Sequence, residues 1–413
     1  MAIIVVPDDY ATISLAVAAA AANDEIQVKS GPYPESVLID SKDHITLVGI
    51  DTGTGYPVVE PVANDHPAYD CAAIIVRKSN FATIDHIVVK NAVVGGEKNY
   101  GILIRASSDV VVQGVEATAL RSAIVIQVEG IDTCQRLVFS SNNFHDILYA
   151  DLSEGFGIDD QAATENEVTV TNNVFLNMQY GIGFNPRDAV GVVGKYVITD
   201  NTFNTIAQTG LAVECNEGAG TNTATVLAYR NGFIANTVAN IHFSETTVVS
   251  VLQTPSPQVY CWKNIPRLGI IGNWYSQHVG TDVNDDGIFD NPEIISAHHI
   301  DTAPLFHLWG SEYTSCQRIR GYVYDAGATA SDNVPIPMAG VTVTATNPET
   351  GVVQTAVTDA AGHYYFALPP IGTGIVVETK VNGYVTVKTV KDVELTSNLP
   401  IDFYLWNVHR YNT

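Results

Sequence analysis

The sequence predicts an all-β protein: a right-handed parallel β-helix with an N-terminal capping helix, followed by a C-terminal antiparallel β-sandwich. Three features of the 413 residues favour this fold class. Short apolar runs separated by turn residues fill most of the chain, residue types recur about every 30 positions in the middle, and apolar and polar residues alternate near the C-terminus. The charged fraction of 15% and the 32 glycines agree with a strand-rich chain.

One helix is expected, at about residues 10–22. Its apolar residues share one face at helical spacing: Ile13, Ala16, Val17 and Ala20. Asp8 or Asp9 stands where an N-cap side chain would accept hydrogen bonds from the first backbone amides. Short β-prone runs follow at residues 26–29, 37–39 and 45–48, so strands are expected after the helix.

The middle of the chain repeats. Asparagine recurs at spacings of 30, 28 and 30 residues: Asn143, Asn173, Asn201 and Asn231. Phenylalanine recurs at spacings of 31, 28 and 30: Phe144, Phe175, Phe203 and Phe233. A third set is spaced by 29 and 30: Gly181-Ile182, Gly210-Leu211 and Asn240-Ile241. One such unit cannot bury its apolar face alone, so the repeats predict stacked coils in which equal positions form columns, ~4.8 Å per coil.

The opening of the chain resembles that of pectin-lyase-like right-handed β-helix proteins. The likeness lies in residues 7–13, in Ser30-Gly-Pro-Tyr-Pro-Glu-Ser-Val37 and in Ile45-Thr-Leu-Val-Gly49. In that family the helix caps the first coil, so the resemblance implies this role for residues 10–22. Residues 271–276, 280–290 and 300–305 resemble the tail of β-helix proteins of the periplasmic copper-protein maturation type. That likeness concerns architecture, because the Met and His ligands that copper prefers are not clustered here.

From about Arg318 the pattern changes to that of an antiparallel sandwich of about seven strands. Apolar and polar residues alternate between turns in residues 319–325, 339–345 and 358–366. This region resembles the carboxypeptidase regulatory-like (transthyretin-like) domain over about 88 residues, which implies an accessory module without catalysis. The predicted organisation is therefore a β-helix over residues 1–315, the sandwich over 316–406 and a short tail over 407–413.

Residues 282–293 match the twelve-residue pattern of a calcium-binding loop. The expected ligands are side-chain oxygens and, at Ile288, the backbone carbonyl: Asp282, Asn284, Asp286, Ile288, Asp290 and Glu293. Gly287 permits the tight turn that lets alternate oxygens converge on Ca²⁺. Flanking helices are not evident, so we expect a free-standing, structural calcium loop that stabilises the end of the stack. The alternative is a solvated turn rich in Asp and Asn.

Polar residues follow the strands that end at Phe184, Val213 and Phe243. The residues expected to bind glycan along this flank are Glu154, Asn185, Arg187, Asp188, Asn216 and Glu245. If the flank is instead catalytic, paired carboxylates there would serve glycoside hydrolysis. The catalytic candidates are Asp159, Asp160, Arg187, Glu214 and Glu217. The adjacent acids Asp159 and Asp160 are similar to those of polygalacturonase-like enzymes, but the companion Asn-Thr-Asp, Gly-His-Gly and Arg-Ile-Lys motifs are absent. Ordinary solvated loop residues are the third interpretation.

The formal net charge of −24 argues against nucleic acid as a partner, because phosphate binding needs a cationic surface. No apolar run approaches the roughly 20 residues that span a bilayer, so membrane insertion is not expected. No signal peptide is visible after Met1. The five cysteines lie far apart without a CxxC pair, which favours buried thiols over a disulfide framework or a zinc site.

Together these features predict an extracellular or virion-surface structural or adhesion protein, stabilised by calcium, that binds a surface glycan through loops of the β-helix. A trimeric tail or spike component built from copies of this chain is one form of the prediction, by analogy of fold. Two alternatives stay open. One is a polysaccharide lyase or glycoside hydrolase acting on the β-helix flank, and the other is a self-assembling surface-layer or sheath subunit.

Overall fold

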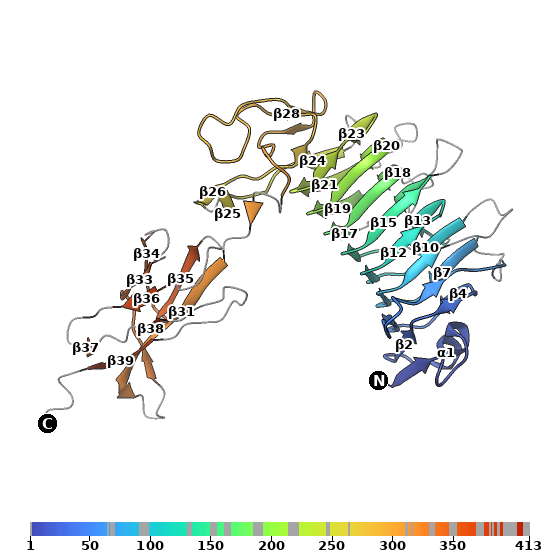
Figure 1. Cartoon of the computed structure of the whole chain (residues 1–413), viewed down its shortest axis with the longest axis horizontal. Coiled ribbons are helices and arrows are strands. Elements are labelled where there is room, and N and C mark those ends of the chain that lie inside the picture. The colour runs from blue at the N-terminus through green and yellow to red at the C-terminus, as the bar shows by residue number, and fades with distance from the viewer. Residues whose placement is uncertain are drawn as a thin grey trace. The chain divides into compact units, whose positions relative to one another are not determined.

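The computed structural model divides the chain into two compact units, residues 1–256 with 270–309 and residues 257–269 with 310–413 (Figure 1). The residues that it describes are 2–63, 66, 71–90, 99–129, 134–148, 155–160, 167–184, 193–213, 223–244, 248–262, 265–309, 313–314, 317–329, 335–346, 353–368, 376–379, 381, 384–385, 389–390 and 403–407. Sequence analysis assigns residues 257–269 to the β-helix. They belong to the second unit instead, because the hairpin of β25 (Gln258–Trp262) and β26 (Ile265–Gly269) pairs with β30 (Tyr313–Thr314).

The first unit is a parallel β-helix with three faces, and the chain passes through the faces in turn (Figure 1). The first face is a 10-stranded sheet: β1 (Ile3–Val6), β2 (Glu25–Lys29), β5 (Thr46–Ile50), β8 (Thr83–Asp85), β11 (Val111–Gln113), β14 (Leu137–Ser140), β17 (Glu167–Thr171), β19 (Val193–Thr199), β21 (Thr223–Tyr229) and β24 (Val248–Val251). Each neighbouring pair in it is parallel, which is the predicted stacking of coils.

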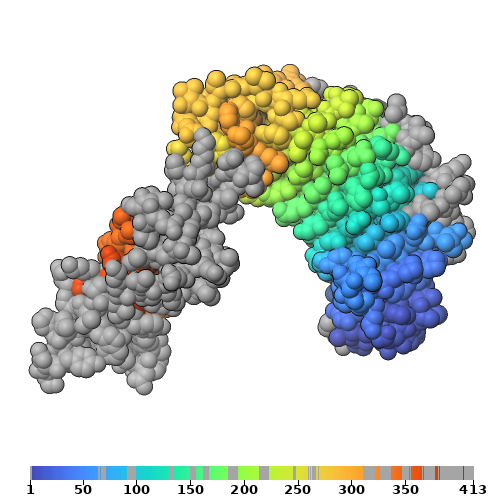
Figure 2. Space-filling view, viewed as in Figure 1, coloured from blue at the N-terminus to red at the C-terminus, as the bar shows by residue number. Residues whose placement is uncertain are grey.

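The second and third faces form one 15-stranded sheet, because β18 (Val174–Phe184) and β20 (Thr202–Val213) run through the bend between them. Besides these two, the second face has β3 (Pro32–Tyr33), β6 (Val58–Val59), β9 (Val88–Lys90), β12 (Glu116–Thr118), β15 (Asn143–Ile147), β22 (Gly232–Ile234) and β27 (Trp274–Tyr275). The third face has β4 (Val37–Asp40), β7 (Cys71–Arg77), β10 (Asn99–Arg105), β13 (Ser122–Gln127), β16 (Phe156–Asp160) and β23 (Ala239–Phe243). In the space-filling view the coils follow one another as a continuous surface (Figure 2).

The repeated phenylalanines form a column inside the β-helix, as predicted. Its rings are fully or almost fully buried and contact one another from coil to coil, the first pair tilted and the later pairs stacked: Phe144, Phe175, Phe203, Phe233 and, at the end, Tyr275. The repeated glycines lie opposite this column. A Cβ atom at Gly181 would lie 2.6 Å from the Phe203 ring and 2.4 Å from the carbonyl oxygen of Gly210. Glycine recurs there because the ring of the next coil occupies the space of a side chain.

A buried ladder of asparagines runs beside the aromatic column. In each step both the backbone N–H and the side-chain amide of one asparagine donate to the Oδ1 of the next, at 2.9 to 3.1 Å, through Asn142, Asn173, Asn201, Asn231 and Asn273. The prediction that Asn143 begins this column is wrong, since Asn143 is exposed and its neighbour Asn142 points inward. Adjacent residues of a strand face opposite sides, so a register error of one residue exchanges them.

The predicted helix is present but shorter: α1 spans Ile13–Ala19 at the N-terminal end of the stack (Figure 1). Its buried face belongs to the main core, as the spacing indicates. Thr12, rather than Asp8 or Asp9, is the N-cap, and its Oγ1 accepts from the Leu15 amide at 3.2 Å. No helix among the described residues is long and apolar enough to cross a bilayer.

Besides the sheet of β25, β26 and β30, the described part of the second unit contains two larger sheets. One has β31 (Gln317–Thr329), β32 (Pro335–Pro337), β35 (His363–Leu368), β37 (Tyr384–Val385) and β39 (Phe403–Asn407), and the other has β33 (Thr342–Thr346), β34 (Val353–Val357), β36 (Val376–Thr379) and β38 (Thr389–Val390). Among the described strands of these two sheets, only β31 and β39 pair in parallel. Val323 and Phe366 of one sheet share a core with Val343 and Val377 of the other, which makes this unit the predicted sandwich.

Candidate functional site

The long strands of the third face carry side chains on both sides, because side chains alternate along a strand. The pairing register arranges those that point away from the core into three outer columns. These are Ala72, Tyr100, Ser122, Phe156, Tyr180, Thr209 and Ala239; Leu38, Ile75, Leu103, Val125, Asp159, Gly183, Ala212 and His242; and Asp40, Arg77, Arg105 and Gln127. The outer side of this face therefore presents side chains that repeat with the coils.

Apolar side chains fill two of the outer columns in the first coils. Ile75, Leu103 and Val125 are fully buried, and they form a small apolar cluster with Ala72 and Tyr100 that is separate from the main core. Strands that are buried on both sides are continuous apolar runs in the sequence. This explains the uninterrupted run of β7 before Arg77.

Further along the stack the same columns become aromatic and polar. The rings of Phe156 and Tyr180 are half-buried and stack with centroids 4.6 Å apart and planes inclined by 13°. Asp159 is 8% exposed, and His242 is exposed at the end of its column. This part of the third face has the mixture of ring surface and polar groups that suits a polar ligand with apolar ring faces.

The two predicted catalytic acids both lie in β16 and face opposite sides of the sheet. Asp159 belongs to an outer column, whereas Asp160 is fully buried between Ile126 and Phe184 of the adjacent coils. The hydroxyl of Tyr196 donates to Asp160 at 3.3 Å. Glycoside hydrolysis needs two carboxyl groups on the two sides of one bond. Asp159 and Asp160 do not meet that requirement as a pair, because the sheet itself lies between them.

A buried thiol lies near Asp160 in the core. Burial, together with the nearby charge of Asp160, raises the pKa of Cys134 to about 12, and its Sγ donates to the carbonyl oxygen of Gln127 at 3.3 Å. A thiol with a raised pKa is a poor nucleophile, because the thiolate is the reactive form. For Cys134 the prediction of a buried thiol is confirmed.

Eight predicted site residues lie outside the residues that the structure describes: Glu154, Asn185, Arg187, Asp188, Glu214, Asn216, Glu217 and Glu245. Their glycan-binding or catalytic roles stay predictions. The strand ends that precede three of these groups are described, and Phe184, Val213 and Phe243 pair in register within one core column. The last described residues of these three strands thus occupy equivalent positions in the stack, as the repeat spacing predicts.

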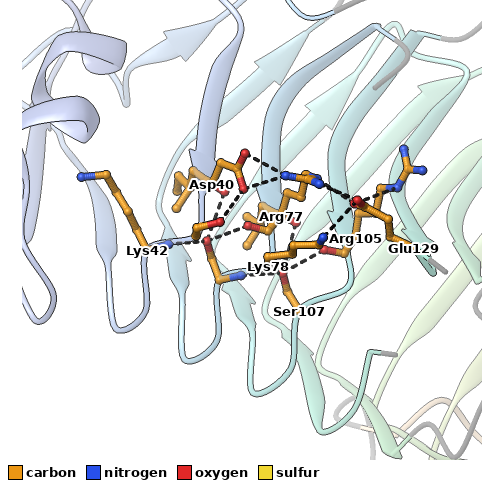
Figure 3. Close-up of polar contacts among 11 residues, drawn as sticks. Asp40, Lys42, Arg77, Lys78, Arg105, Ser107 and Glu129 are labelled. Carbon is orange, nitrogen blue, oxygen red and sulfur yellow. Dashed lines mark hydrogen bonds and ion pairs between the residues drawn. The ribbon is translucent and has the colours of Figure 1, made fainter. Parts of the chain in front are cut away.

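Sequence analysis missed a cluster of charged residues at the edge of the third face (Figure 3). Nη1 of Arg77 donates to the two carboxylate oxygens of Asp40 at 3.0 and 2.9 Å, while its Nε and Nη2 donate to Glu129. Lys78 Nζ lies 3.2 Å and Arg105 Nε 3.6 Å from the same Glu129 carboxylate. Three cations therefore converge on one carboxylate, and a second carboxylate holds the far side of Arg77.

The hydrogen bond from Arg77 and, to a smaller extent, that from Lys78 lower the pKa of Glu129 to about 2, against the opposing effect of burial. The signal that could have revealed the cluster is the repeat itself. Arg77 and Arg105 each end an apolar strand and are 28 residues apart, the spacing also seen in the asparagine and phenylalanine columns. The position of Glu129 in the cluster could not be read from this spacing, because it follows a strand end in a different coil.

The predicted calcium loop is a tight turn whose acidic side chains accept hydrogen bonds from backbone amides. Asp282 accepts from the amides of Asp286 and Gly287 at 3.0 and 2.8 Å, and Asp286 accepts from that of Ile288 at 2.8 Å. Gly287 has a φ of 88°, which glycine adopts without strain. The carboxylate of Asp290 accepts a hydrogen bond from the Val283 amide at 2.8 Å and so closes the turn. Carboxylate, amide and carbonyl oxygens of the type that Ca²⁺ prefers are thus gathered in one turn.

The twelfth position of the loop has a different partner. Glu293 lies in the two-stranded pairing of β28 (Glu293–Ile294) with β29 (Ile300–Asp301), and its carboxylate contacts Nδ1 of His278. In the part of the chain that the structure describes, no three side chains of His, Cys, Asp or Glu lie close enough together to hold a metal ion. The donor types fit calcium, but Glu293 stands apart from them in this arrangement.

The loop belongs to a segment that closes the C-terminal end of the β-helix. Asp301 takes the place of the next asparagine in the ladder: its Oδ2 accepts from the Asn273 amide at 2.7 Å and from the Tyr275 hydroxyl at 3.2 Å. Burial raises the pKa of Asp301 to about 6, although these hydrogen bonds act in the opposite direction. The Leu305 amide also donates to the carbonyl of Asn273 at 2.8 Å. The ladder and the aromatic column therefore both end at this segment.

Family models match both parts of the chain. Residues 70–194 match the right handed beta helix region, and residues 318–405 match the carboxypeptidase regulatory-like domain. This chain joins a right-handed β-helix to a carboxypeptidase regulatory-like domain. The predicted right-handed parallel β-helix, the predicted carboxypeptidase regulatory-like domain and the all-β fold class are thereby confirmed. No curated protein matches the chain in sequence.

Several solved structures are similar to this β-helix protein at low sequence identity and low TM-score. A pectate lyase from Bacillus sp. in complex with trigalacturonate is 12% identical, with a TM-score of 0.36 over 60% of this chain and 82% of that one. An alginate lyase from Paenibacillus sp. is 14% identical, with a TM-score of 0.33 over 60% and 99%. A pectin methylesterase from Aspergillus niger is 15% identical, with a TM-score of 0.35 over 60% and 90%. These likenesses concern the fold alone.

Proposed function

We propose that this protein binds a polysaccharide along the outer side of the third face of its β-helix, as an extracellular or particle-surface structural or adhesion protein. The observation that carries the proposal is the set of outer columns, which repeat with the coils and present the stacked Phe156 and Tyr180 rings next to polar groups. A polymer of sugar units is itself periodic, so successive units can meet equivalent side chains, ~4.8 Å apart along the stack.

The same face supports binding rather than turnover. Of the two adjacent acids, only Asp159 faces the outer side, and Asp160 lies in the core. Without a carboxylate pair, β16 supplies ring contact and hydrogen bonds but no acid–base couple. The lyase or hydrolase alternative would therefore depend on Arg187, Glu214 and Glu217.

The test is a retention and product assay with the full chain on a panel of immobilised acidic and neutral polysaccharides. We expect at least one polysaccharide to retain the protein, with no new reducing ends and no unsaturated product. Retention should weaken in Tyr180→Ala, which removes one ring of the outer pair, and should be unchanged in Phe81→Ala, a 49% exposed ring outside the third face. Product release would support the enzymatic alternative, and a complete lack of retention would reject the proposal.

We also propose that the loop at residues 282–293 binds Ca²⁺ and thereby stabilises the C-terminal end of the β-helix. Support comes from the gathered oxygens of Asp282, Asn284 and Asp286, and from the direct attachment of this segment to the last coil. A thermal melt with added calcium or with a chelator tests this. The midpoint should fall in the chelator for the wild type and stay constant in Asp286→Ala, and an unchanged wild-type midpoint would count against a calcium site.

Self-association into a trimer is a further part of the proposal, and it rests on analogy of fold alone. Sedimentation equilibrium of the full chain, with and without calcium, measures it directly. A monomer at all concentrations would remove the trimeric form of the proposal, and ordered arrays after calcium addition would favour the surface-layer alternative.

A further inference from the structure

The predicted calcium loop has a closed neck, and Glu293 lies outside it. The Asp290 amide donates to the Thr281 carbonyl oxygen at 2.8 Å, so the two ends of the loop meet at these two residues, which we call the neck. Four of the candidate ligands lie between the neck residues in the sequence: Asp282, Asn284, Asp286 and Ile288. Asp290 is itself a neck residue, whereas Glu293 follows three residues after it.

Outside the neck, Glu293 has His278 as its partner. His278 stands three residues before the neck, and its Nδ1 contacts the Glu293 carboxylate. The Nδ2 group of Asn291 donates to Nε2 of His278 at 3.1 Å and to the Val279 carbonyl oxygen at 3.3 Å. A ring nitrogen that accepts a hydrogen bond carries no proton, so in this arrangement the ring proton is on Nδ1 and is donated to Glu293. Both nitrogens of His278 are thus used by residues on the far strand of the neck.

His278 joins the neck to the last coil of the β-helix. Its backbone amide donates at 3.1 Å to the carbonyl oxygen of Tyr275, the last ring of the aromatic column. Its side chain is 5% exposed, and the ring packs edge-on against Phe289 with centroids 4.5 Å apart. On the other side, Glu293 pairs with Asp301 between β28 and β29. Loss of the Glu293 carboxylate would therefore leave a buried N–H of His278 without its acceptor, which is destabilising.

We infer that Glu293 is a positioning residue that fixes the neck to the last coil through His278, and that the loop binds Ca²⁺ without it. The inference rests on the proposed calcium site and specifies its ligands: Asp282, Asn284, Asp286, the Ile288 carbonyl and Asp290. Calcium takes about six to eight oxygen ligands, so water completes the coordination. Without a bidentate twelfth residue, the site is of the weak extracellular kind, with a Kd on the order of 10⁻⁴ to 10⁻³ M.

The first experiment is a calorimetric titration of the full, chelator-treated chain with calcium chloride. Glu293→Gln keeps an oxygen that can accept from His278 but removes the negative charge that a cation prefers. We expect its calcium affinity to stay within about threefold of the wild type, because the side chain is not a ligand. Asp286→Asn makes the same change of charge inside the neck and should weaken calcium binding on the order of tenfold or more. An equal loss in the two variants would show that Glu293 is a ligand and would overturn the inference.

The second experiment measures the thermal midpoint in a chelator, where calcium does not contribute. Glu293→Ala and His278→Ala should each lower the midpoint by about 3 °C or more, and the double variant should melt close to His278→Ala, because the contact can be lost only once. Glu293→Gln should keep most of the wild-type midpoint. Asp146→Ala is the control, since it also removes a carboxylate from a histidine, His145. The Asp146 side chain is 58% exposed, so the midpoint should change by less than about 1 °C.

The two experiments separate failure of this inference from failure of the calcium proposal. Absence of calcium binding would reject the calcium site and the ligand set derived from it, and coupled midpoints in the chelator would then still assign Glu293 to His278. Calcium binding together with additive losses of midpoint for Glu293→Ala and His278→Ala would reject the positioning role and leave the calcium site in place.

Discussion

The N-terminal and C-terminal coils of the β-helix fill equivalent interior positions with different side chains. In the C-terminal coils one column consists of Phe144, Phe175, Phe203, Phe233 and Tyr275. The same column continues into the N-terminal coils as Val59, Val89 and Ala117. The coil can hold either aromatic or aliphatic side chains in this column. Where the column is aromatic, the residues opposite it are glycines, which leave space for the rings.

The buried polar ladders differ in the same way. The C-terminal coils carry the asparagine ladder that ends at Asp301. The N-terminal coils use serines at a different corner, after the third face: the Ser79 amide donates to Ser107 Oγ, and the Lys42 amide to Ser79 Oγ, both at 3.0 Å. At each bend some buried backbone amides have no partner in the strand pairing. The ladder side chains accept hydrogen bonds from these amides. Stacked coils thus need a polar ladder at a tight bend, but neither its residue type nor its corner is unique.

The largest expected effect is loss of a ring from the aromatic column. Phe203→Ala removes a fully buried side chain that stacks on both Phe175 and Phe233, and it should lower the free energy of unfolding by about 3–5 kcal/mol. Val89→Ala, in the same column of the N-terminal coils, should cost only about 2 kcal/mol. Denaturant unfolding measures both. Equal losses would show that the two halves are packed alike in energy despite their different residues.

The end of the asparagine ladder should make stability depend on pH. Because the pKa of Asp301 is raised from 3.8 to about 6, the folded state binds its proton more tightly than the unfolded state does. This group therefore contributes stability below pH 4 that is lost as the pH rises through 6, by about 3 kcal/mol. Asp301→Asn has no titratable group at this position, so the variant should lose this pH dependence. It also loses the hydrogen bond that the Ala303 amide donates to the carboxylate, and that loss is the same at every pH. Wild type and variant are compared by unfolding at pH 4 to 8, and parallel curves would contradict the assignment.

The register of the ladder gives a sharper test with a smaller effect. Asn142 is buried, and Asn142→Ala should cost about 2 kcal/mol because the Val115 and Asn173 groups that it bonds lose a partner. Asn143→Ala should stay within about 0.5 kcal/mol of the wild type, because that side chain is exposed. Denaturant unfolding of the two variants is the measurement. If Asn143→Ala lowered the free energy of unfolding more than Asn142→Ala, Asn143 would be the ladder residue, as the sequence predicts.

The smallest effect is expected for the serine ladder. Ser107→Ala leaves the Ser79 amide without its side-chain acceptor and should cost about 1 kcal/mol. Unlike the loss at Asp301, this loss should be independent of pH, because no titratable group takes part in the hydrogen bond. A cost as large as that of Asn142→Ala would show that the two ladders contribute equally to the stack.

The spacing of residue types predicted the coil architecture because equal positions in stacked coils share one environment. Large rings at Phe175 and Phe203 with glycines opposite recur clearly in sequence, whereas the aliphatic N-terminal coils vary more freely and show no such period. The choice between neighbours failed at Asn142 and Asn143, and the adjacent acids Asp159 and Asp160 were expected to act together. In each pair the side chains are chemically equivalent, and only the strand register decides which of them faces the core.

By itself, the sequence of this protein determined the stacked β-helix, the sandwich that follows it and the positions of the aromatic column, because each rests on local pattern and on a repeat that every coil must obey. Tertiary structure alone decided which side chains meet across coils. Asp40, Arg77 and Glu129 come from three different coils, and nothing in their spacing requires them to converge. Long-range pairing of this kind depends on where each segment leaves the stack, which is set by packing rather than by local residue pattern.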